Sequence, residues 1–427
     1  MMTDQPISLW DTSAAEAVPD AANSGHLEGG RAVDVAIIGG GYTGLSTALH
    51  CAQKGLSALV LEAHQIGQGG SGRNVGLVNA AAWLPPQEVR ARLGPVYGPR
   101  FVERFGAAPD YVFSLIERHQ IRCEARQNGT IHAAHNAAGL RSLEARHRAW
   151  QALGAPVELL SRSQAADMIG SPRFHGGLLD RRAGTINPMG YCRGLARAAI
   201  GAGATVSTGL PAQRLTRVAG RWRVETGAGA LEAKSVVLAT NAYTDTLWPG
   251  LTNEYTPIHY FQLATEPLGQ EAAHILPARQ GVWDTGKIMQ SIRRDAEDRL
   301  IVGSMGRVIG DWREGPTQRF AKRLLARLFP DLAVTFSSAW HGVIALTDDH
   351  LPRIHHLDEG LYAPIGYNGR GITTGTVLGA VMADVLTGAP PDTLPLPLTA
   401  PRPARAPALM ARLYDTAFTA NQMIKGF

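Results

Sequence analysis

The fold of this 427-residue chain is decided by the stretch Val33-Asp34-Val35-Ala36-Ile37-Ile38-Gly39-Gly40-Gly41-Tyr42-Thr43-Gly44. Its apolar run at 35–38 predicts a buried parallel strand that breaks into a glycine turn. In such a turn Gly39 allows the tight bend, Gly41 lets the backbone approach a pyrophosphate, and Gly44 lets the next helix press against the strand. The stretch therefore predicts a strand–turn–helix unit whose helix N-terminus can hold phosphate.

The residues that follow continue the same unit. Small or apolar side chains at 45, 48, 49 and 52 share one face of a helix, and Gly55 ends that helix. A second buried strand at 58–61 delivers Glu62, whose carboxylate can accept hydrogen bonds from both hydroxyls of a ribose and would repel a 2′-phosphate. Strand, turn, helix, strand and acid in this order predict a site for the ADP half of NAD or FAD.

Composition and charge narrow the class of protein. The chain is 45% hydrophobic and 18% charged with a net charge of +5, which predicts a globular protein of two or three domains. Its basic residues are scattered, so nucleic-acid binding is not expected. Cys51, Cys123 and Cys192 are far apart and form no CxxC pair, which predicts neither a disulfide framework nor a metal site.

The N-terminal 30 residues are polar, with Asp4, Asp11, Glu16 and Asp20, and they contain no apolar core of a signal peptide. No run of about 18 apolar residues occurs in the chain, so no transmembrane segment is expected. From these features we expect a cytoplasmic protein.

Three separated segments have the character of a nucleotide-binding domain. The elements predicted in them are the unit at 33–78, a helix at 191–201, strands at 204–206 and 235–241, a hairpin at 221–233, a strand at 361–365, and an apolar helix that starts near Ile372 after the loop 366–371. Insertions at about 85–160 and 255–339 lie between them, and a proline-rich stretch at 389–407 precedes a helix predicted at 408–423. This layout predicts a substrate domain interleaved with a cofactor domain.

Several motifs occur together in chain order: 39–44 with Glu62, 66–76, 237–242, 265–268, 340–342 with 347–353, and 366–371. In this combination, which covers 33–388, the chain resembles the D-amino-acid oxidase-like family of FAD-dependent oxidoreductases, the family of glycine, sarcosine and gamma-glutamylputrescine oxidases. The resemblance implies an α/β fold in which a Rossmann-like FAD-binding domain is interleaved with a sheet-based α+β substrate domain. The implied boundaries are 30–84, 155–254 and 340–400 for the first, 85–154 and 255–339 for the second, and a C-terminal helix at 401–427.

The resemblance also implies a non-covalently bound FAD. A glycine-flanked loop at 69–76 can expose backbone N–H groups near phosphate or flavin, and a helix starting near Ile372 can direct its N-terminal N–H groups at the flavin ring. The residues expected to lie against FAD are Gly39, Gly41, Tyr42, Thr43, Gly44, Glu62, Ala63, Ser71, Gly72, Arg73, Asn74, Gly76, Leu77, Ala212, Thr240, Asn241, Gly342, Gly369, Arg370, Gly371, Ile372 and Thr373. At the position of Asn241 the family often has glycine.

The implied reaction is hydride transfer from the carbon beside a substrate nitrogen to flavin N5, which gives an imine that hydrolyses. The substrate would be a small primary or secondary amine or amino acid, and the electrons would pass to O2 or to a protein or quinone acceptor. The residues predicted near the reacting atoms are Trp340, His341, Tyr260, His259 and Arg293. Aromatic faces suit an amine, and Arg293 can either clamp a carboxylate or pair with Asp295.

Two further points leave alternatives open. Sarcosine oxidases carry a lysine beside flavin N5, whereas the matching stretch 299–303 offers Ile301, so oxidase and dehydrogenase both stay open. The chain can instead be a flavin-binding subunit of a multiprotein amine dehydrogenase. A nicotinamide-dependent dehydrogenase would also use Gly39, Gly41, Gly44 and Glu62, but it would leave the loops 71–76 and 366–371 without a role.

Overall fold

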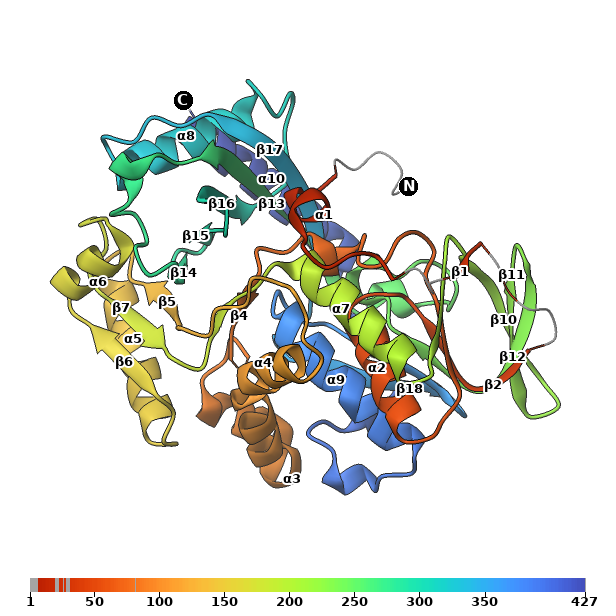
Figure 1. The fold of residues 1–427 in the computed structure, drawn as a ribbon. Helices are drawn as coiled ribbons and strands as arrows, with labels where there is room; N and C mark the ends of the chain where they lie inside the picture. The colour runs from red at the N-terminus through yellow and green to blue at the C-terminus, as the bar shows by residue number, and fades with distance from the viewer. Residues whose placement is uncertain (1–6, 20–22, 26, 28–30, 81, 427) are drawn as a thin grey trace.

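The computed structural model describes residues 7–19, 23–25, 27, 31–80 and 82–426, in which two large sheets are joined by helices (Figure 1). Asp4, Asp20 and the domain start predicted at residue 30 lie outside these residues. The mixed α/β architecture predicted from the sequence is confirmed.

The first sheet contains the predicted nucleotide-binding strands. Its strands are β1 (Asn23–Ser24), β2 (Ala32–Ile38), β3 (Ala58–Leu61), β9 (Thr205–Thr208), β10 (Ala212–Val218), β11 (Arg221–Thr226), β12 (Gly229–Leu238), β18 (Arg353–Asp358), β19 (Leu361–Ile365) and β20 (Leu398–Thr399). They follow the order β1-β9-β3-β2-β12-β19-β18-β20, and β10 and β11 form a meander with β12. The central strands β9, β3, β2, β12 and β19 are parallel. The predicted hairpin at 221–233 is formed by β11 and the first half of β12, and the predicted buried strand that follows it is the second half of the same long strand β12.

Side-chain alternation along β2 sends residues to two different cores. Val35 and Ile37 pack on the face that carries α2 (Tyr42–Gln53), α7 (Pro188–Gly201) and α9 (Gly371–Leu386). Ala36 and Ile38 pack on the other face with residues of the β10–β12 meander. The central strand is therefore buried on both sides, as expected of a parallel sheet between two layers.

Helices α2 and α9 cross closely because glycines lie at the contact. A Cβ on Gly379 would lie 2.4 Å from the Cβ of Ser46, and one on Gly375 would lie 3.0 Å from the Oγ1 of Thr43. The hydroxyl of Ser46 donates to the carbonyl of Thr376 at 2.7 Å. This contact fixes the position of α9 relative to the glycine turn at the start of α2.

The second sheet is largely antiparallel and has the order β17-β13-β16-β15-β14-β5-β7-β6. Its strands are β5 (Thr130–Ala133), β6 (Val157–Leu160), β7 (Gly177–Asp180), β13 (Thr256–Pro267), β14 (Gly281–Asp284), β15 (Gln290–Arg294), β16 (Arg299–Met305) and β17 (Phe336–Leu346). Its accompanying helices are α5 (Ala137–Gln151), α6 (Arg162–Ile169) and α8 (Pro316–Leu328), and the short strands β4 (Leu77–Val78) and β8 (Gly184–Thr185) pair between the sheets.

Strand pairing redistributes three of the predicted domain segments. β6 and β7 lie within the predicted FAD-binding range 155–254, yet they pair in the second sheet. The part of β17 after residue 339, which lies in the predicted FAD-binding range 340–400, pairs there as well. Conversely, α3 (Pro86–Gly106) and α4 (Ala108–Arg118) from the predicted substrate range pack against α9. These long-range pairings have no local sequence signal, because a buried strand can pair with any sheet that offers a free edge.

Several described residues of the polar N-terminal segment are part of the core, which the composition of the segment does not indicate. Trp10 of α1 (Leu9–Ser13) is fully buried and meets Trp340 edge to face, with ring centroids 5.9 Å apart. Its indole N–H donates to the carbonyl of Asn74 at 2.9 Å. Glu16 is also buried, and it accepts hydrogen bonds from the backbone N–H of Arg122 and from the side chain of Arg197.

The predicted C-terminal helix is α10 (Pro407–Gly426), which packs on α8 and β13. It lies behind β13 and β17 in Figure 1. Nowhere in the described residues is a helix both long and apolar enough to cross a bilayer.

The crossing of α2 and α9 predicts opposite effects for two glycine-to-alanine changes. Gly379→Ala places a methyl group against Ser46 and should lower the free energy of unfolding by about 1–3 kcal/mol, as overpacking does. Gly201→Ala, at the end of α7 where a Cβ meets nothing within 4 Å, should be neutral or stabilise by up to about 1 kcal/mol. Denaturant unfolding of both variants tests this, and equal effects would show that α9 can move away from α2 at no cost.

Candidate active site

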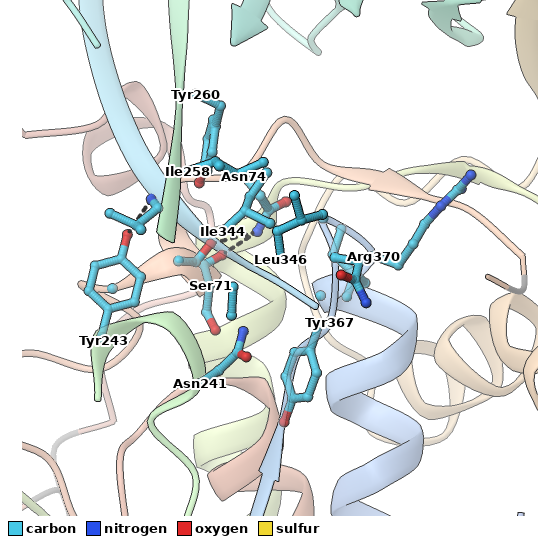
Figure 2. Close-up of a pocket in the computed structure, with 18 of the residues that line it drawn as sticks. Ser71, Asn74, Asn241, Tyr243, Ile258, Tyr260, Ile344, Leu346, Tyr367 and Arg370 are labelled. Carbon is cyan, nitrogen blue, oxygen red and sulfur yellow. Dashed lines mark hydrogen bonds between the residues drawn. The ribbon is translucent and has the colours of Figure 1, made fainter. Parts of the chain in front are cut away.

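A cavity of about 920 Å³ is lined by residues of both sheets. Figure 2 shows side chains that line it from four places: the glycine loop after β3 (Ser71, Asn74), the turn after β12 (Asn241, Tyr243), the loop before α9 (Tyr367, Arg370) and the second sheet (Ile258, Tyr260, Ile344, Leu346). Its size is near the upper end of what small-molecule sites have.

One end of the cavity is built by the glycine turn and Glu62. Gly39 adopts φ +111°, and a Cβ on Gly44 would lie 1.9 Å from the carbonyl oxygen of Gly39, so both positions require glycine. The carboxylate of Glu62 accepts from the backbone N–H of Gly40 at 2.6 Å and from that of His64 at 2.9 Å. Burial raises the pKa of Glu62, while these two hydrogen bonds favour the charged form.

The loop at 69–76 is fixed onto the start of α2. The hydroxyl of Ser71 accepts from the backbone N–H of Tyr42 at 3.0 Å, and the hydroxyl of Tyr42 donates to the carbonyl of Ser71 at 2.6 Å. Asn74 donates to the carbonyls of Gly70 and Ser71. The loop therefore keeps a fixed shape beside the helix N-terminus, where negative charge is favoured.

Asn241 connects the turn after β12 to the loop before α9. It adopts φ +43°, in the left-handed region that glycine and asparagine tolerate best, which explains why asparagine can stand where the family often has glycine. Its side-chain oxygen accepts from the backbone N–H of Gly366 at 3.0 Å. The contact aligns the loop that carries the N-terminus of α9.

The structure brings most of the predicted FAD contacts to the cavity. The residues that line it are Gly39, Gly41, Tyr42, Thr43, Glu62, Ala63, Ser71, Asn74, Leu77, Ala212, Thr240, Asn241, Gly369, Arg370, Gly371 and Ile372. The predicted contacts that do not line it are Gly44, Gly72, Arg73, Gly76, Gly342 and Thr373. Four of these are glycines against which other groups pack, Arg73 donates to the carbonyls of Gln68 and His341, and Thr373 donates to that of Asn79.

Tyr260 is the one predicted catalytic residue that lines the cavity. It is 8% exposed, and its hydroxyl has no hydrogen-bond partner among the described residues. Burial raises the pKa of Tyr260 well above its usual value. A Cβ on Gly342 of the neighbouring strand would lie 2.3 Å from this hydroxyl, so glycine at 342 makes room for it.

His259 and His341 lie off the cavity because of strand register. β13 and β17 are antiparallel, with Tyr260 opposite Gly342 and Phe261 opposite His341, so residues one position from Tyr260 face the other side. The Nδ1 of His259 lies 3.1 Å from a carboxylate oxygen of Asp415 on α10. Burial, together with nearby Arg73, lowers the pKa of His341 to about 4, so this ring is neutral near pH 7.

Trp340 and Arg293 are buried behind the cavity wall. The indole N–H of Trp340 donates to the carbonyl of Arg73 at 2.8 Å. Arg293 donates to the carbonyls of Val75, Gly76 and Ile186 and stacks over Trp10, so its charge supports the glycine loop rather than a ligand. Among the described residues Asp295 pairs with Arg299 instead of with Arg293. The catalytic roles predicted for these four residues stay predictions, and their positions favour structural roles.

The predicted Arg370 lines the cavity within a cluster of aromatic residues that were not predicted from the sequence. Trp283 of β14 stacks on His132 of β5, with ring centroids 3.4 Å apart, and meets Trp83 edge to face at 5.2 Å. The guanidinium of Arg370 lies over both tryptophans, 4.5 Å from the ring of Trp83 and 4.8 Å from that of Trp283. The parallel register of β14 and β5 sets Trp283 beside His132, and no local pattern in the sequence signals that pairing.

Arg370 is a buried cation without an anion. It is 6% exposed, and no carboxylate of the described residues lies within ion-pair distance of it. Burial lowers the pKa of Arg370, and the charge of the half-buried Arg146 lowers it further, although Asp180 acts in the opposite direction. Because an unpaired buried charge is costly, the cluster is suited to a negatively charged group entering from the cavity.

Comparisons with known proteins agree with this geometry. The family model described as "FAD dependent oxidoreductase" matches residues 34–385. Gamma-glutamylputrescine oxidoreductase of Escherichia coli (strain K12) is 32% identical over 400 residues, which cover 91% of this chain and 90% of that protein. Sarcosine oxidase subunit beta of Rhizobium meliloti (strain 1021) is 30% identical over 216 residues, 48% of this chain and 49% of that protein.

A solved structure supports the fold. The crystal structure of glycine oxidase from Geobacillus kaustophilus superposes with a TM-score of 0.72 at 21% sequence identity, covering 86% of this chain and 99% of that one. The cofactor is FAD, and the cavity fits it: Gly39 and Gly41 line it at the start of α2 without side chains, and Glu62 lines it where its carboxylate can accept hydrogen bonds from a ribose.

Replacement of Glu62 by glutamine tests the ribose contact. Glu62→Gln removes the charge and leaves an amide NH2 facing one of the two backbone donors, so the dissociation constant of FAD should rise about ten- to a hundredfold. Fluorescence titration of the apoprotein with FAD measures this change. Glu117→Gln, an exposed position on α4, is the matched control. An unchanged affinity in Glu62→Gln would place the ribose elsewhere.

Proposed function

We propose that this chain, which belongs to the family of FAD-dependent oxidoreductases, oxidises the C–N bond of a small amine or amino acid. The observation that carries the proposal is Arg370, a buried cation with no carboxylate of the described residues within ion-pair distance, at the wall of the same cavity that Glu62 and the glycine turn line. The cavity therefore has a place for a second, negatively charged or polar molecule beside the cofactor. The similarity to gamma-glutamylputrescine oxidoreductase supports an amine as that molecule.

The bound FAD would accept a hydride from the carbon beside the amine nitrogen. The chain's own residues bind and orient the substrate and keep water away, which is why no dedicated general base is required. Tyr260 presents an unpartnered hydroxyl to the cavity and can accept or donate a hydrogen bond at the amine. Trp83 and Trp283 add apolar surface to the cavity wall, which favours the neutral amine over the solvated cation.

The N-terminus of α9 and Arg370 favour negative charge at one place. Gly369, Arg370, Gly371 and Ile372 line the cavity, and the N-terminal N–H groups of this 16-residue helix carry its positive dipole end. A substrate carboxylate or sulfonate held there would place the amine at a fixed distance from Arg370. Arg370 was predicted from the sequence as an FAD contact, and its position between two tryptophans favours the substrate instead.

FAD is proposed to be held without a covalent bond. His341, the histidine in the motif where attached family members carry a linking residue, faces away from the cavity. The stretch 70–76 contains neither cysteine nor histidine.

The electron acceptor is proposed to be O2 or a protein or quinone. Ile301, at the position where sarcosine oxidases carry a lysine, packs with Trp10 and Trp340 and does not line the cavity. The cavity wall therefore presents no cation at that position to favour O2. The partial similarity to sarcosine oxidase subunit beta favours, as a second candidate, a role as the flavin-binding subunit of a multiprotein dehydrogenase.

Anaerobic reduction followed by exposure to air tests the function and the acceptor separately. We expect a panel of primary and secondary amines and amino acids to bleach the flavin absorption, and the yellow colour to return more slowly in air than with an artificial acceptor. Rapid reoxidation in air with release of hydrogen peroxide would identify an oxidase. Failure of every amine to bleach the flavin would contradict the proposal.

Arg370→Met tests which molecule the guanidinium holds. The dissociation constant of an ω-amino acid should rise more than about tenfold, because a charge-assisted hydrogen bond is lost, while that of the alkylamine of equal chain length should change less than about threefold. Arg370→Lys should retain part of the affinity for the ω-amino acid. Arg118→Met, on the exposed face of α4, should leave the dissociation constants of both ligands unchanged. Equal weakening of both ligands, or release of FAD, would show that Arg370 serves the cofactor.

A further inference from the structure

The C-terminal helix α10 contributes to the cavity although it lies outside the stretch that matches the family model. That stretch ends at residue 385, whereas α10 spans Pro407–Gly426. Two of its side chains, Tyr414 and Phe418, line the same cavity as Glu62 and Arg370. They lie one helical turn apart and stack, with ring centroids 5.7 Å apart.

Side chains on one face of α10 hold it to the second sheet. Asp415 meets His259 of β13, and the buried Gln422 accepts from the hydroxyl of Thr317 at 2.8 Å and donates to the carbonyl of Arg307 at 3.2 Å. Gly306, directly after β16, adopts φ +117°, and a Cβ there would lie 3.2 Å from the Cβ of Phe418. The helix therefore covers the end of β16 at a fixed place.

The proline-rich segment before α10 is also anchored. The backbone N–H of Ala404 donates to the carbonyl of Asn253 at 2.8 Å, and that of Arg405 donates to the carboxylate of Asp348 at 3.1 Å. The backbone N–H of Arg402 donates to the buried carboxylate of Glu254. These bonds attach the segment to residues that lie just before β13 and just after β17, so α10 has one defined path to the cavity.

Tyr414 and Phe418 share the cavity wall with apolar side chains of the second sheet. These are Ile258, Met305, Ile344 and Leu346. Such a wall suits an apolar chain or ring of a bound molecule, whereas Arg370 and the start of α9 suit its charged group.

We propose that α10 is a specificity-determining cap in which Tyr414 and Phe418 bound the space for the hydrocarbon part of the amine substrate. This inference rests on the proposed amine oxidation. Substrate, rather than FAD, is the molecule assigned to this wall because FAD is common to the family, and the family model ends before α10 begins. Members of the family differ in their substrates, so we expect a helix outside the shared stretch to contact the substrate rather than FAD.

A series of straight-chain primary amines of increasing length tests the cap. Binding is followed anaerobically through the change in the flavin spectrum, and reduction is followed through bleaching in the same samples. In the parent protein, affinity should rise by about fourfold per added CH2 up to a limiting length and then fall. In Phe418→Ala and Tyr414→Ala the limit should move to longer amines, with the affinity for the amine that binds best to the parent reduced about three- to tenfold.

Control variants separate the cap from folding and from FAD binding. Leu413→Ala changes a neighbouring side chain that is 54% exposed and should leave the length dependence as in the parent. Phe418→Leu keeps an apolar side chain in case Phe418→Ala unfolds, and it should shift the limit by a smaller amount. Thermal unfolding and FAD content are measured for every variant, and both should match those of the parent in Tyr414→Ala.

Two results would overturn the cap. One is an unchanged length limit in folded Phe418→Leu and Tyr414→Ala, and the other is loss of FAD from these variants while they stay folded, which would assign the wall to the cofactor. Amines that bind with the predicted length dependence without bleaching the flavin would contradict amine oxidation and still support the cap. If the parent shows neither binding nor bleaching, both proposals fail.

Discussion

The close crossing of α2 and α9 is the constraint on which the site depends. Gly375 and Gly379 bring α9 against Thr43 and Ser46, so two helices far apart in the sequence begin at the same cavity. Each N-terminus carries the positive end of a helix dipole. One lies beside the loop at 69–76 and the other carries Arg370. The glycines at the crossing fix the separation of these two termini, of which the first lies at the proposed cofactor end of the cavity and the second at the end proposed for the charged group of the substrate.

Register in the second sheet decides which side chains reach that cavity. Because alternate residues of a strand face opposite sides, the pairing of Tyr260 with Gly342 sends Tyr260 inward and sends its neighbour His259 to Asp415. A shift of one residue would exchange them and bury a polar imidazole against the cofactor. The glycine at 342 secures the register, since any side chain there would collide with the hydroxyl of Tyr260.

The cofactor half of the site could be read from the sequence because its signals are local. The strand, the turn with Gly39, Gly41 and Gly44, and Glu62 follow one another within a single unit, and each has a steric or hydrogen-bonding reason to be where it is. The substrate half could not be read in this way. His132 and Trp283 meet only through the pairing of β5 with β14. Trp340 does not line the cavity as predicted, and it packs instead against Trp10, which comes from a segment of polar composition. Such contacts depend on chain topology, which local patterns do not contain.

The two halves are coupled through charge. Arg370 is buried and Arg146 is half-buried near the tryptophans, and bringing a guanidinium out of water costs several kcal/mol unless an anion compensates it. Cation–π contacts with Trp83 and Trp283 offset part of this cost, each by about 0.5–2 kcal/mol. An anionic group that binds beside Arg370 would offset the part of the desolvation cost that the cation–π contacts leave. It would do so at the end of the cavity where α9 begins. A substrate that carries its charge at one end and its hydrocarbon part at the other is therefore oriented before any chemistry occurs, with its charged group at Arg370 and its apolar part toward the second sheet and α10.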